Sequence, residues 1–195
     1  MGRPAVFALA CAVAAIAAAC SSPAVRFYTL SSVAKPVSAT ADLSIAVGPV
    51  SVPPLVDRAQ IVVTTGTNQV SFDQFNRWAS PLEDDIALVV AEDLATMLGT
   101  ARVTLLSSSP GAEVDYRVQI EVRNFESSPG KEAALDAVWR VWRTKDGKSQ
   151  SGRSSAREPV QQDGFDALAA AHSRAVAKLS QDIAAAVRTL EGTVK

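Results

Sequence analysis

Residues 114–123 read VDYRVQIEVR and alternate strictly between apolar and polar side chains. Apolar residues occupy the even positions, and charged or amide residues occupy the odd ones. Successive side chains of a β-strand point to opposite faces of a sheet, so this segment predicts a strand with one apolar and one charged face. Such a strand covers a core with one side and meets water with the other.

Neighbouring segments continue this pattern. Apolar residues occupy every second position from Leu135 through Trp139 to Val141, which again predicts a strand. Residues 145–148 (KDGK) are typical of a tight hairpin turn. The Ser- and Arg-rich residues 149–157 predict an edge strand whose polarity prevents aggregation. Further strands are predicted at residues 43–47, 61–64, 70–72 and 103–105.

Two segments have the apolar spacing of an amphipathic helix. In the first, Ser80 can cap the helix, Pro81 suits the first position, Glu83 completes a capping box, and Gly99 is a natural stop. The second follows Asp163, and its stripe comprises Phe165, Leu168, His172, Val176, Leu179, Ile183, Val187 and Leu190. The predicted fold class is therefore α+β with two layers, in which a mostly antiparallel or mixed sheet has one face covered by two amphipathic helices.

The N-terminus is organised like a secretory signal. Arg3 precedes an uncharged apolar stretch, residues 5–19, which ends in small residues before Cys20. Residues 17–20 (AAAC) resemble the bacterial lipobox, with Ala17 where the usual motif has leucine. We therefore expect a signal peptide at residues 1–19 and acylation of Cys20. Ordinary cleavage beside an incidental cysteine and an uncleaved anchor helix are the alternatives.

The rest of the chain divides into two parts. Residues 20–42 are rich in Ser, Ala, Pro and Thr, and are interpreted as the lipidated cysteine and a tether with one short extended piece at residues 27–30. Residues 43–195 are interpreted as one domain of ordinary size. By resemblance to enterobacterial sorting, Ser21 predicts that the acyl chains enter the outer membrane, with the domain on its periplasmic face.

Composition narrows the classes of function. The net charge is −1 and no basic block is present, so nothing indicates a nucleic-acid partner. Cys11 lies in the predicted signal peptide and Cys20 would be acylated. The folded domain is therefore expected to have neither a disulfide nor a cysteine metal site.

Catalytic signals are weak. His172 is the single histidine, and its place on an apolar stripe predicts a core or semi-buried residue with one hydrogen-bond partner. Five acidic residues cluster on the first helix: Glu83, Asp84, Asp85, Glu92 and Asp93. Glu83 to Asp85 suit the positive N-terminus of the helix, which is a better explanation than a metal site. We expect a non-catalytic binding or assembly component without metal or cofactor, and the alternative is an envelope hydrolase that uses His172.

Four segments together resemble a known family. They are residues 27–30 (FYTL), 45–50 (IAVGPV) with Pro53, 55–62 (LVDRAQIV) and 75–82 (FNRWASPL). They look like segments of the ABC-type transport auxiliary lipoproteins, the group that includes the paraquat-inducible lipoprotein of the Pqi system. The resemblance implies phospholipid transport across the periplasm, with a partner containing mammalian-cell-entry (MCE) domains. The lipoprotein would dock that assembly at the outer membrane or complete its channel, and no Walker motif for ATP hydrolysis is present.

Aromatic and arginine residues are favoured at interface centres. The partner-binding residues predicted on this basis, together with one loop leucine, are Leu55, Arg58, Phe75, Arg77, Trp78 and Trp142. Two alternatives remain open: Phe75 and Trp78 would cover the core, and the two arginines would pair with Asp57 or Glu83, or contact lipid headgroups. Self-assembly into a homo-oligomeric ring and a lipid cavity inside the domain are further hypotheses.

Overall fold

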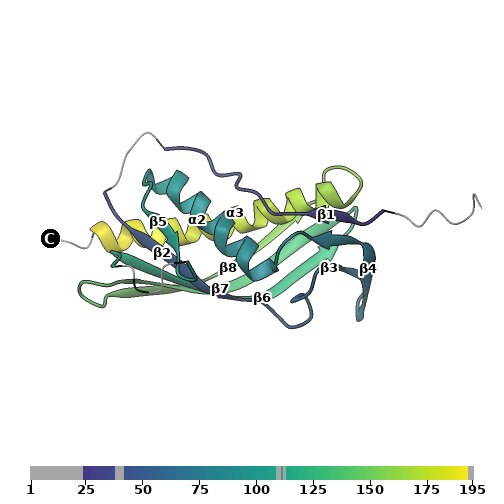
Figure 1. Ribbon diagram of the computed structural model, residues 1–195, viewed down its shortest axis with the longest axis horizontal. Helices are drawn as coiled ribbons and strands as arrows, with labels where there is room; N and C mark the ends of the chain where they lie inside the picture. The colour runs from purple at the N-terminus through teal and green to yellow at the C-terminus, as the bar shows by residue number, and fades with distance from the viewer. Residues whose placement is uncertain (1–23, 38–41, 109–110, 112, 193–195) are drawn as a thin grey trace, which may run out of the picture.

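The structure is a computed structural model that describes residues 24–37, 42–108, 111 and 113–192. Within these residues, two helices lie on one face of a five-stranded sheet, and a smaller three-stranded sheet lies at one end of the molecule (Figure 1). The predicted α+β class, with helices packed on a sheet, is confirmed.

The large sheet has the strand order β5-β2-β6-β7-β8. Strand β2 pairs in parallel with β5 and β6, whereas β6, β7 and β8 pair antiparallel, so the sheet is mixed. The predicted polar strand is β8, and it lies at an edge as expected. The bounds are β2 Ile45–Ser51, β5 Val103–Leu105, β6 Tyr116–Ser128, β7 Glu132–Arg143 and β8 Ser149–Pro159.

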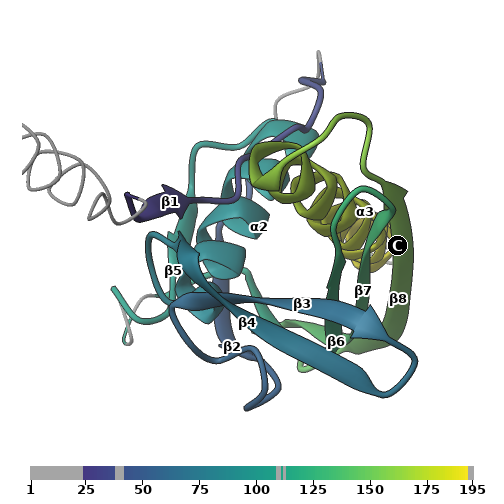
Figure 2. The same cartoon turned by 90° about the vertical axis from the view of Figure 1, so that its right-hand side faces the viewer.

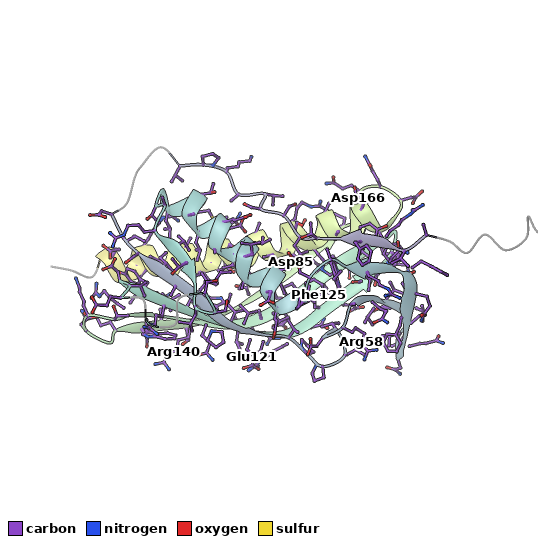
Figure 3. All side chains as sticks on the ribbon, in the orientation of Figure 1. Arg58, Asp85, Glu121, Phe125, Arg140 and Asp166 are labelled. Atoms are coloured by element: carbon purple, nitrogen blue, oxygen red, sulfur yellow. The ribbon has the colours of Figure 1, made fainter. Side chains whose placement is uncertain are left out.

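The alternation in β6 divides the two faces of this sheet. Tyr116, Val118 and Ile120 are buried under the helices. The charged residues point the other way, as Glu121 on β6 and Arg140 on β7 show (Figure 3). The face without helices is thus lined by charged side chains, as the sequence predicts.

Helices α2 (Leu82–Leu98) and α3 (Phe165–Gly192) cover the other face. Gly99 ends α2 in the left-handed conformation (φ 66°), as predicted. The predicted capping box is wrong, because Pro81 is the N-cap and no side chain caps the helix. The Pro81 carbonyl instead accepts the Asp85 N–H at 3.1 Å, so the first helical hydrogen bond starts one residue later than expected.

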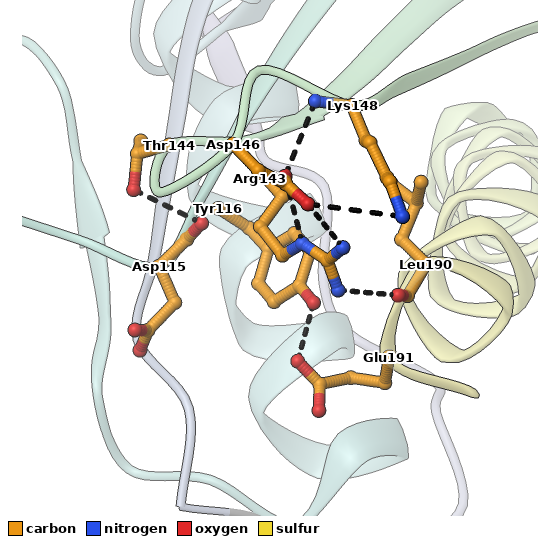
Figure 4. Close-up of polar contacts among 8 residues, drawn as sticks. All are labelled: Asp115, Tyr116, Arg143, Thr144, Asp146, Lys148, Leu190 and Glu191. Carbon is orange, nitrogen blue, oxygen red and sulfur yellow. Dashed lines mark hydrogen bonds and ion pairs between the residues drawn. The ribbon is translucent and has the colours of Figure 1, made fainter. Parts of the chain in front are cut away.

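Buried Arg143 fastens the C-terminal end of α3 to the sheet (Figure 4). Its Nη1 donates to the Leu190 carbonyl at 2.7 Å, while Nε and Nη2 donate to the Asp146 carboxylate at 3.0 and 2.6 Å. This guanidinium lowers the pKa of Asp146 to about 2. The Tyr116 hydroxyl donates to the Glu191 carboxylate. Burial of the Tyr116 ring, together with this hydrogen bond, raises the pKa of Tyr116 to about 12. The hairpin turn between β7 and β8 and the last turn of α3 therefore hold each other in place.

The small sheet was not predicted as a separate unit. It has the order β1-β4-β3, with β1 Arg26–Tyr28, β3 Gln60–Gly66 and β4 Gln69–Trp78. Strands β3 and β4 form the expected hairpin, and β1 pairs in parallel with the end of β4. Strand β1 therefore brings part of the predicted tether into the fold.

The chain after β1 runs along the two helices (Figure 1). We call Thr29–Ser32 the strap. The Asp85 carboxylate accepts the Leu30 N–H at 2.8 Å and the Thr29 hydroxyl at 2.9 Å, and the Asp93 carboxylate accepts the Ser32 hydroxyl at 2.6 Å. Burial raises the pKa of Asp93. The strap is thus held by two buried aspartates of α2.

Candidate functional site

Apolar side chains gather on the small sheet. Phe27, Val70, Phe72 and Phe75 each keep 40% or more of their surface exposed, as does Leu55 in the loop before β3. The β3–β4 hairpin carries three of them across one end of the molecule (Figure 2). Exposed apolar residues that lie together mark interaction sites, whereas isolated ones are ordinary.

A bulge in β4 presents Phe75 to solvent. The Asp73 carboxylate accepts the backbone N–H groups of Phe75 and Asn76 at 2.9 and 2.7 Å. The pairing with β3 shifts register here, so these residues leave the regular ladder. Bulges redirect side chains in this way. The hydrogen bonds of Asp73 therefore help to hold the bulge that exposes Phe75.

A groove of about 220 Å³ lies between the hairpin and β6. We call it the hairpin groove, and its lining includes Leu55, Val62, Thr64, Val70, Asn124 and Phe125. Five apolar residues share the lining with a larger number of polar ones, so the groove offers both apolar contacts and hydrogen-bonding groups. The groove is large enough for side chains of a partner.

The two predicted arginines do not form the expected ion pairs. Cζ of Arg58 lies 4.2 Å from the centre of the Phe72 ring, which is a cation–π contact. Nη2 of half-buried Arg77 donates to the Gln74 carbonyl at 3.4 Å. Within the described residues, no ion pair joins either arginine to Asp57 or Glu83, so that expectation was wrong. Nε of Arg77 is buried without a hydrogen-bond partner, so only the outer part of its guanidinium group can meet another anion, whereas Arg58 is exposed.

The tryptophans lie away from the exposed cluster. Trp78 is 4% exposed and packs edge-on against Phe125 and His172, with ring centres 6.0 Å apart in each pair. It therefore covers the core and is not available for direct contact with a partner. Trp142 is half-buried on the open face of the large sheet, where it pairs in register with Arg117.

The six predicted partner-binding residues therefore do not form one surface. Leu55, Arg58 and Phe75 are exposed on and beside the small sheet, and Arg77 adjoins them. Phe27 and Val70 belong to the same exposed cluster but were not predicted. The spacing of Val70 and Phe72 predicted a strand, but it could not show that no other element packs against their side chains. Phe27 was placed in the tether.

His172 is a core residue with the single partner expected of it. Its Nε2 lies 2.8 Å from the Ser127 hydroxyl, and its ring stacks on Phe125 at 3.9 Å. Its Nδ1 has no hydrogen-bond partner, and burial lowers the pKa of His172 to about 3. A catalytic base needs access to substrate and usually a third group that orients it. Because Ser127 is also buried, this serine–histidine pair meets neither condition.

Some acidic residues of α2 are exposed to solvent, and others bind the strap. Glu83 and Asp84 are exposed in the first turn, whereas Asp85 and Asp93 bind the strap. In the described part of the chain, no three potential metal ligands of the His, Cys, Asp or Glu type come together. Nor is any helix there both long enough and apolar enough to cross a bilayer. The predicted signal peptide and Cys20 lie outside the described residues.

Comparisons with known proteins identify the family. Two crystal structures share the fold at a TM-score of 0.69 each. One, of a DUF330 protein from Xanthomonas campestris, is 18% identical and covers 86% of this chain and 100% of its own. The other, of a protein described as uncharacterized, is 19% identical and covers 85% and 99%. No curated protein sequence matches the chain. The family profile described as the ABC-type transport auxiliary lipoprotein component matches residues 28–184, and the chain belongs to this family.

Proposed function

We propose that the protein is a lipid-anchored, non-catalytic subunit of an MCE-type intermembrane lipid transport system. Acylated Cys20 holds it at the periplasmic face of the outer membrane, where it docks the MCE-domain assembly or completes its channel. The family match over residues 28–184 carries this proposal, because membership in a transport auxiliary family implies a partner. The buried state of His172 supports a non-catalytic role.

The hairpin groove is the docking site that the geometry favours. Leu55 and Val70 line it and keep 46% and 41% of their surface exposed, so a partner can reach them without displacing the core. Arg58, whose charge lies over the Phe72 ring, provides a cation beside the same strands. Interfaces commonly centre on apolar and arginine side chains of this kind.

Capture of the partner from detergent-solubilised envelopes tests this function. Wild-type protein is expected to retain an MCE-domain protein that mass spectrometry identifies. Leu55→Asp and Val70→Asp should each reduce this capture at least tenfold, because a charge in the groove must be desolvated on docking. Leu88→Asp is the matched control, since Leu88 is 46% exposed on α2, away from the groove. Failure of the wild-type protein to retain any MCE-domain protein would contradict the proposal.

Among the described residues, the packing between sheet and helices does not favour a lipid cavity inside the domain. The space between the large sheet and the helices is filled by apolar side chains such as Ile120, Leu179 and Ile183, each at most 1% exposed. A hollow of about 480 Å³ lies instead on the open face of the sheet, and Glu121, Arg140 and Arg153 are among its lining. Val138 and Trp139 line it as well, so this hollow is a mixed apolar and charged depression on the surface of the sheet and not a cavity between sheet and helices.

A further inference from the structure

Three apolar side chains lie at the β1 edge of the small sheet, on β1, on the residue before it and on β4. Arg26 pairs in register with Asn76, and Phe27 with Arg77, so Val25 and Phe27 lie beside the segment that begins at Phe75. Val25, Phe27 and Phe75 are 41%, 64% and 41% exposed. We call these three residues the β1 patch. It lies at the β1 edge of the sheet, whereas the hairpin groove is lined from the β3 edge.

Two arginines lie at the same edge as the β1 patch: Arg77 is in register with Phe27 and shares its face, whereas Arg26 precedes Phe27 on β1 and points to the other face. Arg26 is exposed and Arg77 is half-buried, and neither forms an ion pair within the described part of the chain. Guanidinium groups bind phosphate oxygens in a bidentate manner, and aromatic rings favour the level of the lipid headgroups. Cationic and aromatic groups at one edge match the chemistry of a phospholipid surface.

The attachment point limits how far this edge can lie from a membrane. Val25 follows Cys20 by five positions and Phe27 by seven, and a fully extended chain spans about 3.6 Å per residue. Val25 therefore lies within about 18 Å of the acylated residue and Phe27 within about 25 Å. The C-terminal end of α3 lies at the opposite end of the molecule from β1 (Figure 1).

We propose that the β1 patch rests on the lipid headgroups of the membrane that holds Cys20, with Phe27 and Phe75 inserted at the interface and Arg26 and Arg77 on lipid phosphates. This inference depends on the proposed function, because it requires acylation of Cys20. The contact gives the domain a fixed orientation instead of free rotation about its anchor. Because β3 is the opposite edge of the small sheet, the hairpin groove stays open to a partner beside the membrane.

Site-specific fluorescence on the acylated full chain tests the contact. The domain contains no cysteine after Cys20, so F27C and F75C each introduce one reactive thiol for an environment-sensitive fluorophore. L88C is the matched control, because Leu88 is an apolar residue on α2 whose exposure, 46%, lies between those of Phe75 and Phe27. Each protein is reconstituted into vesicles of phosphatidylethanolamine and phosphatidylglycerol, with or without nitroxide-labelled lipid. Intact mass first establishes whether Cys20 is acylated.

The expected result is blue-shifted emission and severalfold stronger quenching by nitroxide lipid at positions 27 and 75 than at position 88. Equal quenching at the three positions in acylated protein overturns this inference and leaves the proposed function standing. Labels that are shielded from water but not reached by nitroxide lipid also overturn it, because a protein partner or a second copy then covers the patch. An unmodified Cys20 overturns both proposals.

Discussion

His172 resembles a catalytic residue in its chemistry, but its position in the core makes it a residue that affects the stability of the fold. It lies next to a serine hydroxyl, yet both residues are closed off from solvent, and the imidazole is held in its neutral form. A buried neutral histidine gains a proton when the chain unfolds in acid, so folding is coupled to pH through this one group. Burial keeps substrate away from His172, and it also makes the free energy of unfolding depend on pH through this residue.

We expect acid to destabilise the fold through His172. Its pKa is about 3 in the folded protein against 6.5 when solvated, so its contribution is complete above pH 6.5 and is lost progressively as the pH falls toward 3. Between pH 7 and pH 4 the wild-type protein should lose about 3 kcal/mol through this residue, at about 1.36 kcal/mol for each pH unit below 6.5. Urea unfolding, followed by tryptophan fluorescence, measures this loss.

The control for this prediction is His172→Gln, which keeps a polar group for Ser127 but cannot titrate. The variant is less stable than wild type at pH 7, because glutamine fills the stacked site poorly. Its deficit should shrink as the pH falls, since it lacks the histidine's acid sensitivity. A deficit that stays constant from pH 7 to pH 4 would show that His172 is not buried in its neutral form.

At the scale of elements, two aspartates of α2 connect the N-terminal segment to the domain. Asp85 accepts both the Leu30 N–H and the Thr29 hydroxyl, and Leu30 itself is only 4% exposed. The strap follows β1 directly, so its attachment also fixes the position of that strand. Hydrogen bonds to α2 therefore help to hold in place the strand that follows the predicted anchor.

Asp85→Ala is expected to loosen the strap and leave the helices intact. The Leu30 N–H would remain buried without an acceptor, at a cost of about 1–3 kcal/mol. Amide hydrogen exchange should become faster at residues 26–32, while α2 and α3 keep their protection. Asp84→Ala is the control, because Asp84 is the exposed neighbour in the same first turn. Uniform loss of protection across the domain would contradict a local role.

The sequence predicts the elements with periodic patterns better than their long-range pairing. Strand β6 and the two helices bury continuous apolar faces, so periods of 2 and 3.6 residues locate them. Strand β1 has three residues and pairs with β4 about 50 positions away, and no local pattern encodes such a contact. Buried Asp85 and Asp93 were missed for a related reason. Carboxylates on a helix are normally solvated, and the strap that covers these two lies about 55–60 positions away in sequence.

The candidate site was predictable only in part for the same physical reason. Leu55, Arg58 and Phe75 have the residue types of an interface, and the structure shows all three exposed. Trp78 has the same chemistry, but its position at the end of β4 turns it into the core against Phe125. Residue type indicates what a side chain can bind, whereas exposure depends on tertiary packing that one segment does not specify.

At the scale of the whole molecule, the exposed apolar side chains of the small sheet lie at the same end of the domain as the strand that follows the predicted anchor (Figures 1 and 2). The described part contains no helix that could cross a bilayer. Stable attachment through acylation takes more than one chain, because a single chain of myristoyl length gives only marginal binding. We therefore expect the location of the protein to depend on acylation of Cys20.

Cys20→Ser is expected to abolish acylation and to remove the protein from the outer-membrane fraction. Cys11→Ser is the matched control, because Cys11 lies within the predicted signal peptide and its thiol has no role in the mature chain. Envelope fractionation with intact mass spectrometry separates the outcomes. Ordinary signal cleavage predicts that both variants yield the same unacylated, released protein as wild type. An uncleaved anchor predicts that both keep residues 1–19 and remain in the membrane. Only acylation at Cys20 makes the two cysteines differ, so equal behaviour of the two variants would contradict the anchor.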